Sequence, residues 1–195
     1  VGRKAELALL DDWYRHDLDH PFLAVIGLGG MGKSALTWAW LQNLLRQGQA
    51  PPLVVWWSFY ESDGTMDRLL AAVLEHFGDD PRRFPTLRAA VERLLNRLRQ
   101  TPALVVLDGA ERLLRAYGSL GAAYQADALE DGAAGAGMRQ CIDPVTGTLL
   151  TWLAQPGLTQ AMTLMSSRML PQELTGRGGG LLTGVRRHDL TGLAP

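Results

Sequence analysis

Residues 27–34 read Gly27-Leu28-Gly29-Gly30-Met31-Gly32-Lys33-Ser34, which is the pattern G-x-x-x-x-G-K-[ST] of a phosphate-binding loop. Its glycines permit positive φ angles and carry no side chain that would hold the backbone away from a phosphate. Successive N–H groups can then form an anion-binding concavity, to which the next helix adds the positive end of its dipole. The pattern therefore predicts a site for a nucleoside phosphate.

Each residue of the loop has an expected role in that site. Lys33 is expected to face solvent and phosphate and to place its charge on the β and γ groups, and the Ser34 hydroxyl is a predicted ligand of Mg²⁺. The expected contacts of the nucleotide along the loop are Gly27, Gly29, Gly30, Met31, Gly32, Lys33, Ser34 and Ala35.

The flanking sequence is what such a loop needs. Residues 22–26 form a short apolar run, typical of a strand buried on both faces, and residues 35–45 have the pattern of a helix. A glycine-rich turn between strand and helix is the alternative. Only Lys4 and Lys33 occur in the chain, so a chance match to the lysine of this pattern is rare, and the nucleotide site is favoured.

Composition limits the other functions that need consideration. A chain of 195 residues can form one domain with one sheet covered by helices on both sides. The net charge is −1 and the arginines are scattered, so no basic stripe indicates nucleic-acid binding. The single Cys141 excludes an internal disulfide and fits the cytoplasm, and no apolar run has the length of a membrane span.

The rest of the chain predicts strands that alternate with helices. Strands are expected over 53–60, 103–108, 161–168 and 185–190. Helices are expected after an opening turn to about residue 14, over 65–77, along an apolar stripe from residue 87 to residue 98, and over 147–154. Trp56 and Trp57 are expected to point to opposite faces of the sheet and to pack beneath helices. The Ala- and Gly-rich residues 117–147 are too long for an ordinary connection and are predicted to be an insertion.

Two further strands end in residues with chemical potential. Asp108 follows four apolar residues and would reach the carboxyl edge of the sheet, where it can help to hold Mg²⁺; the alternative is a strand that simply stops at an Asp in a turn. Arg168 would reach the same edge from strand 161–168, with surface solvation or helix capping as the alternative. Both residues are therefore candidates for the nucleotide site.

Together these residues resemble the nucleotide-binding domain of the STAND class of signalling ATPases, on the NB-ARC/NACHT side. The glycine-rich loop matches the G-x-G-G-x-G-K-[ST] variant of that class, and Asp108-Gly109-Ala110-Glu111 is similar to the NACHT form of its Walker B motif. Ser166-Ser167-Arg168 resembles the sensor 1 motif, which contacts the γ-phosphate. Residues 57–60 are similar to bacterial members, and residues 190–193 resemble the passage into a helical lid.

The resemblance implies a fold and a function. The fold would be a P-loop NTPase of the ASCE type, a three-layer αβα sandwich with a five-stranded, mainly parallel sheet in the order 2-3-4-1-5. The ligands would be ATP or ADP with Mg²⁺, held by Ser34 and Asp108, and Val1, Gly2 and Arg3 would lie against the adenine. Lys33, Asp108, Glu111 and Arg168 would carry out slow ATP hydrolysis.

The resemblance also implies a larger protein around this domain. Residues 1–195 would be one switch domain excised from it, an expectation that the absence of an initiator Met at Val1 supports. A helical lid, an effector domain and a repeat sensor would be its other parts, and ATP would permit the full protein to form a homo-oligomer. These partners are expectations from the family alone.

One departure from the family leaves alternatives open. Gly109 stands where NB-ARC proteins usually carry a second acid, so activation of water would fall to Glu111, which would reach it only in an assembled or lid-closed state; otherwise Glu111 is a surface residue. An AAA+-type turnover ATPase doing remodelling work is the main alternative function. A small-molecule kinase lacks a recognisable second substrate pocket, and a GTPase is disfavoured because no N-K-x-D motif occurs.

Overall fold

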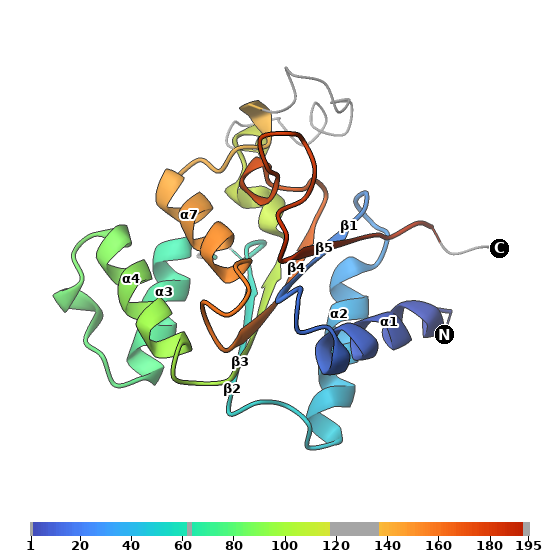
Figure 1. The fold of residues 1–195 in the computed structure, drawn as a ribbon, viewed down its shortest axis with the longest axis horizontal. Coiled ribbons are helices and arrows are strands. Elements are labelled where there is room, and N and C mark those ends of the chain that lie inside the picture. Colours follow the sequence, from blue (N-terminus) through green and yellow to red (C-terminus); the bar gives the residue numbers. More distant parts are fainter. Residues whose placement is uncertain (1, 62–63, 118–136, 193–195) are drawn as a thin grey trace.

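The structure, a computed structural model, describes residues 2–61, 64–117 and 137–192. Strands and helices alternate along the chain and form one sheet with helices on both sides (Figure 1). The strands are β1 Phe22–Ile26, β2 Leu53–Ser58, β3 Ala103–Asp108, β4 Ala161–Ser167 and β5 Val185–Asp189. The α-helices are α1 Lys4–His16, α2 Lys33–Arg46, α3 Met66–His76, α4 Leu87–Leu98 and α7 Pro144–Leu153. Short 3-10 helices are Pro81–Arg83, Ala110–Leu113, Arg115–Tyr117 and Gln172–Leu174.

All neighbouring strands of the sheet run parallel, in the order β2-β3-β4-β1-β5. This confirms the expected five-stranded fold and its strand order. The parallel arrangement brings the carboxyl ends of β1, β3 and β4 to one edge, with Ile26 opposite Ser167 and Ser58 opposite Asp108. The loops that follow these strands therefore meet where the sequence predicts the nucleotide.

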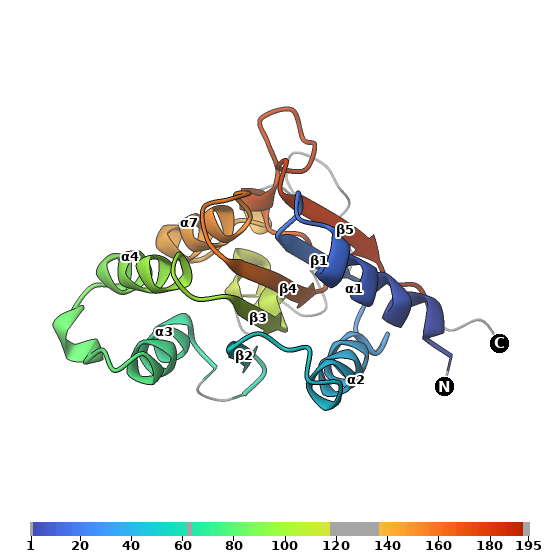
Figure 2. The same ribbon diagram turned by 60° about the horizontal axis from the view of Figure 1, so that its bottom comes forward.

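Two hydrophobic cores lie on opposite faces of the sheet. Because successive strand residues alternate in direction, Phe22 and Ala24 of β1 face α3, α4 and α7, whereas Leu23 and Val25 face α1 and α2 (Figure 2). The tryptophans of β2 follow the expected division, because Trp57 packs against the first core and Trp56 against the second.

The helix boundaries follow local sequence signals. The Thr65 and Thr86 side chains accept hydrogen bonds from N–H groups of the first turns of α3 and α4, and Asp143 does the same for α7. The expected start of the last helix at residue 147 was wrong, since α7 begins at Pro144. Asp143 followed by Pro144 is a typical helix start, and Gly147 lies within the first turns of the helix.

The expected bounds of the insertion, 117–147, include residues that the structure places in the domain. Cys141 forms an antiparallel bridge with Leu114, and residues 144–147 belong to α7. The described residues from 137 onward are thus part of the domain, and residues 118–136 of this prediction lie outside the described part of the chain. No helix in the described ranges is long and apolar enough to cross a membrane.

One buried hydroxyl in the sheet offers a test of the packing. Thr163 of β4 is 0 % exposed, and its Oγ1 has no hydrogen-bond partner among the described residues. Thr163→Val removes this unsatisfied group and keeps the shape, so we expect the free energy of unfolding in urea to rise by about 1 kcal/mol.

Thr37 supplies the matched control for that experiment. It is equally buried, but its hydroxyl donates to the carbonyl of Lys33 at 3.1 Å. Thr37→Val is expected to lower the free energy of unfolding by about 1 kcal/mol. A loss of stability of the same size in both variants would show that the Thr163 hydroxyl is satisfied.

Candidate nucleotide-binding site

The glycine-rich loop connects β1 to α2 and needs its glycines for two different reasons. Gly30 and Gly32 have φ angles of 78° and 81°, in the left-handed region. Gly27 is instead required by a close backbone neighbour, whereas Gly29 lies against the end of a flexible side chain. A Cβ on Gly27 would lie 2.8 Å from the carbonyl oxygen of Leu190, and a Cβ on Gly29 would lie 2.9 Å from the Arg168 guanidinium. Gly27, Gly30 and Gly32 thus each have a structural cause.

Lys33 does not face solvent, which corrects the expectation from the sequence. Its side chain is buried, and its Nζ donates to the carbonyl oxygens of Gly27 at 2.6 Å and Leu28 at 3.0 Å. The ammonium is therefore held inside the loop, where charged hydrogen-bond donors for phosphate are needed. α2 begins at Lys33, directly after left-handed Gly32, so the helix N-terminus opens toward the same place.

Ser34 and Asp108 are brought together as expected. The Ser34 hydroxyl donates to Asp108 Oδ1 at 2.8 Å, and the Ser166 hydroxyl of β4 donates to the same oxygen. A hydroxyl and one carboxylate suit Mg²⁺, which usually keeps several waters and takes one or two carboxylates plus phosphate oxygens. No group of three or more His, Cys, Asp or Glu side chains arranged to hold a metal occurs within the described ranges. The donors present fit Mg²⁺ that arrives with a nucleotide.

Glu111 is a buried acid close to this pair, not a surface residue. It is 1 % exposed, its Oε1 accepts a hydrogen bond from the Tyr60 hydroxyl, and its Oε2 accepts one from the backbone N–H of Arg168 at 3.1 Å. The Arg168 guanidinium lies 3.5 Å from Glu111 Oε1 and beside Gly29, so it links the acid to the glycine-rich loop. Surface solvation and helix capping are therefore the wrong alternatives for Arg168.

Tyr60 also explains why residue 109 is a glycine. Gly109 has a φ of 74°, and a Cβ there would lie 2.6 Å from the Tyr60 ring. The ring thus lies where the side chain of residue 109 would otherwise be. Its hydroxyl bonds to Glu111 instead, and the Arg112 guanidinium lies 5.7 Å from the ring centroid. Tyr60 therefore leaves no room for a side chain at position 109.

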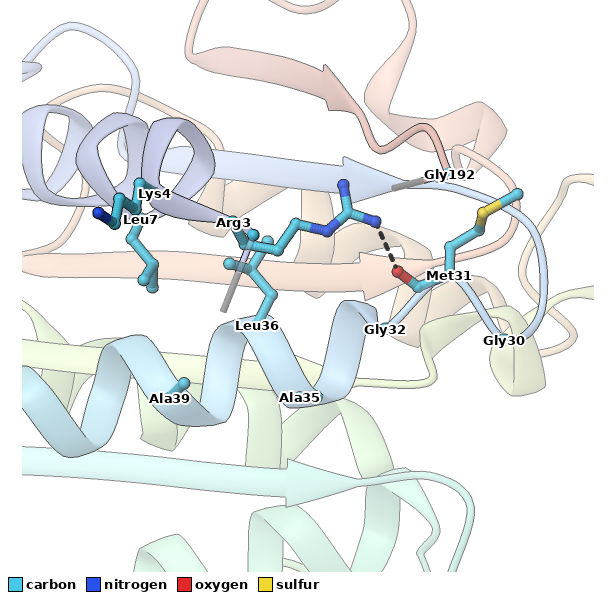
Figure 3. A pocket seen from close by; sticks show the side chains of 11 residues that line it. Arg3, Lys4, Leu7, Gly30, Met31, Gly32, Ala35, Leu36, Ala39 and Gly192 are labelled. Carbon is cyan, nitrogen blue, oxygen red and sulfur yellow. Dashed lines mark hydrogen bonds between the residues drawn. The ribbon is translucent and has the colours of Figure 1, made fainter. Parts of the chain in front are cut away.

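A pocket of about 430 Å³ adjoins the loop on the side of α1 and α2 (Figure 3). Its walls are mostly backbone and apolar side chains, which suits a planar base. Figure 3 shows the Arg3 side chain extending along the pocket to the carbonyl of Met31. The lining residues are Gly2, Arg3, Lys4, Leu7, Gly30, Met31, Gly32, Ala35, Leu36, Ala39 and Gly192.

The structure divides the predicted site residues into two neighbouring groups. One group lines the pocket: Gly2, Arg3, Gly30, Met31, Gly32 and Ala35. The other lies at the sheet edge: Gly27, Gly29, Lys33, Ser34, Asp108, Glu111 and Arg168. Val1 lies outside the described residues.

Two residues of the site were missed by the sequence analysis. Tyr60 was placed within a strand, but β2 ends at Ser58 and Tyr60 belongs to the following turn. Ser166 was considered only as part of a motif, although its hydroxyl bonds to Asp108. A sequence signal for Tyr60 did exist. Ser58, two residues before Tyr60, ends its strand opposite Asp108, and residues that follow strand ends meet at this edge of the sheet.

The Tyr60–Glu111 contact predicts a loss of stability at alkaline pH. Burial and the hydrogen bond to Glu111 raise the pKa of the Tyr60 hydroxyl. The folded protein therefore retains this proton at pH values where the unfolded chain, with a tyrosine pKa of about 10, has lost it. The free energy of unfolding should fall as pH rises above about 10, and Tyr60→Phe should make that fall smaller. Urea unfolding from about pH 8 to 11 measures it; equal slopes in both proteins would contradict the contact.

Comparisons with known proteins place this geometry in context. An uncharacterised WD repeat-containing protein of Nostoc sp. is 27% identical over 199 residues, which cover 98% of this chain and 14% of that protein. The chain thus spans only about a seventh of that relative's length.

Similar solved structures come from proteins of low sequence identity. A chain of the Drosophila ORC bound to DNA has a TM-score of 0.55 and 18% identity, over 96% of this chain and 42% of that one. AMPPCP-bound DnaA from Aquifex aeolicus has a TM-score of 0.44 and 16% identity, over 97% of this chain and 46% of that one. The first of these shows the shared fold.

The sequence profile of the AAA domain matches residues 16–137. The match extends over more than half of the chain and includes the glycine-rich loop, Asp108 and Glu111. This chain therefore belongs to the AAA domain family.

Proposed function

We propose that this chain is the ATP/ADP-binding switch domain of a STAND-type signalling ATPase, with slow, Mg²⁺-dependent ATP hydrolysis. The observation that carries the proposal is the state of Glu111. Both of its oxygens accept hydrogen bonds from the protein, from the Tyr60 hydroxyl and the Arg168 N–H. An acid held in this way is poorly available to accept a proton from water, which suits a timer better than rapid turnover.

Each part of the site has its own role in this proposal. The backbone of the glycine-rich loop and Lys33 bind the phosphates, and Ser34 and Asp108 hold Mg²⁺. Mg²⁺ would neutralise charge on the phosphate oxygens when bound. Arg168 lies beside Gly29 and stabilises negative charge at the γ-phosphate. Glu111 is the base for the attacking water once the Tyr60 bond is released.

The base is adenine in this proposal. Gly2 and Arg3 bring backbone groups to the pocket. Among the described residues that line it, none carries a carboxylate that could pair with the N1–H and exocyclic amine of guanine. The apolar side chains of Leu7, Leu36 and Ala39 supply contact for either face of a purine.

The longer protein around this domain is part of the proposal. The WD repeats named in the Nostoc relative support a repeat sensor in proteins of this kind. ADP would hold a closed form, and ATP would permit homo-oligomerisation. The test is the molar mass of the full-length protein by light scattering with Mg·ATP and with Mg·ADP. A larger species with ATP is expected, and identical masses would overturn the switch.

A turnover ATPase of the AAA+ type is the second candidate. Two observations favour it: the AAA domain match, and the position of buried Glu111 close to Asp108, where a catalytic acid belongs. The two functions differ in rate. Steady hydrolysis by the oligomer at about one turnover per second or faster would favour the turnover enzyme, and a much slower rate favours the switch.

A further inference from the structure

The segment after β5 lies along the glycine-rich loop. We call residues 190–192 the exit segment. The Leu190 N–H donates to the carbonyl of Ile26 at 2.6 Å, and its own carbonyl packs against Gly27 so closely that a Cβ there would lie at 2.8 Å. At the other end, a Cβ on Gly192 would lie 3.9 Å from the sulfur of Met31. The exit segment therefore runs beside the loop from Gly27 to Met31.

Arg3 joins the two segments through one nitrogen. Its Nη2 donates to the carbonyl oxygen of Met31 at 3.0 Å and to that of Thr191 at 2.8 Å. Its Nη1 donates to the Glu6 carboxylate at 2.6 Å, and this bond lowers the pKa of Glu6. The Arg3 side chain is only 16 % exposed. Both terminal nitrogens of its guanidinium are held by hydrogen bonds.

We propose that Arg3 couples occupancy of the nucleotide pocket to the position of the exit segment. Gly30, Met31 and Gly32 line the pocket, so a nucleotide bound there orders the backbone that carries the Met31 carbonyl. The guanidinium bonds to this carbonyl and to that of Thr191. A nucleotide that orders the loop backbone therefore also restricts the motion of Thr191. Arg3 is thus a positioning residue in this role, and the inference rests on the proposed nucleotide function.

The geometry of the guanidinium makes this role specific to arginine. Two donors are directed at carbonyl oxygens from different parts of the chain while a third is fixed by Glu6 on α1. Lysine carries its donors on one nitrogen, so it cannot bond to both carbonyl oxygens while a second nitrogen is held by Glu6. By thermodynamic reciprocity, a residue that transmits order from pocket to exit segment also strengthens nucleotide binding when the exit segment is in place.

The test is amide hydrogen exchange of the chain with and without Mg·ADP, in the parent, Arg3→Gln and Arg3→Lys. In the parent we expect ADP to slow exchange at residues 190–192 and at residues 29–32 by at least about tenfold. In Arg3→Gln the loop should remain protected by saturating ADP, while the protection of the exit segment falls to less than about twofold. Arg3→Lys should resemble Arg3→Gln.

Arg15→Gln is the control, because Arg15 lies on the same helix and bonds only to the side chains of Gln47 and Gln49 among the described residues. It should keep the full protection of both segments. Unchanged protection of the exit segment in Arg3→Gln, with the loop protected, would overturn the coupling alone. Absence of ADP protection at both segments of the parent would overturn the proposed function, and the coupling with it.

Discussion

Replacing Lys33 with alanine is expected to weaken Mg·ATP binding by at least about 100-fold, because it removes charge-assisted hydrogen bonds worth roughly 1.5–3 kcal/mol each. The loss of stability should be smaller. The carbonyls of Gly27 and Leu28 lose a donor, but both belong to an exposed loop that water can reach. Isothermal titration measures the affinity, and thermal circular dichroism measures the fold.

Arg46→Ala is the matched control for this variant. Arg46 ends the same helix that Lys33 begins, and its guanidinium bonds only to Gln42 and Asn43 in the described part of the chain. The control removes one positive charge of α2 far from the loop and should leave the affinity within about twofold of the parent. Equal affinities of the Lys33 variant and the parent, with both folded, would refute the phosphate-binding role.

Replacing Glu111 with glutamine is expected to lower the rate of ATP hydrolysis by about 100-fold and to leave nucleotide affinity nearly unchanged. The change removes a proton acceptor and no metal ligand. Its size is conserved, so glutamine can still accept a hydrogen bond from Tyr60. Because the parent is expected to hydrolyse ATP slowly, the rate is measured by single-turnover hydrolysis of radiolabelled ATP.

Glu92→Gln is the control for general effects of removing an acid. Glu92 is exposed on α4 and pairs with Arg88 on the same helix. It should hydrolyse ATP at the parent rate. Hydrolysis by the Glu111 variant at that same rate would show that Glu111 is not the base. The attacking water would then be positioned by Arg168.

The sequence was sufficient for the parts of the fold that local pattern determines. The boundaries of β1 were predicted to the residue, and the apolar run before Asp108 and the stripe from Leu87 to Leu98 located β3 and α4, because each lies between clear breaks. The strand order came from the family resemblance, since periodicity carries no information about which strands pair. The predicted start of α7 was wrong, although Asp143 and Pro144 are a typical N-cap and first residue of a helix.

The site was predictable in its residues but not in its contacts. Tyr60 and Glu111 are separated by 51 positions, and Arg168 and Glu111 by 57, so only the fold could show that they meet. The burial of Lys33 was likewise invisible, because it depends on the loop folding back so that its own carbonyls face the ammonium. The role of Arg3 required the exit segment to lie beside the loop.

The most direct measurement of the central claim is a competition titration with fluorescently labelled ADP and Mg²⁺. We expect one site per chain, and nucleotide binding at this site should require Lys33. We also expect unlabelled ADP to displace the label at a concentration at least about tenfold lower than GTP does, because the described lining of the pocket offers no acid to guanine. Displacement by GTP as effective as that by ADP, or saturable binding that persists unchanged in Lys33→Ala, would contradict it.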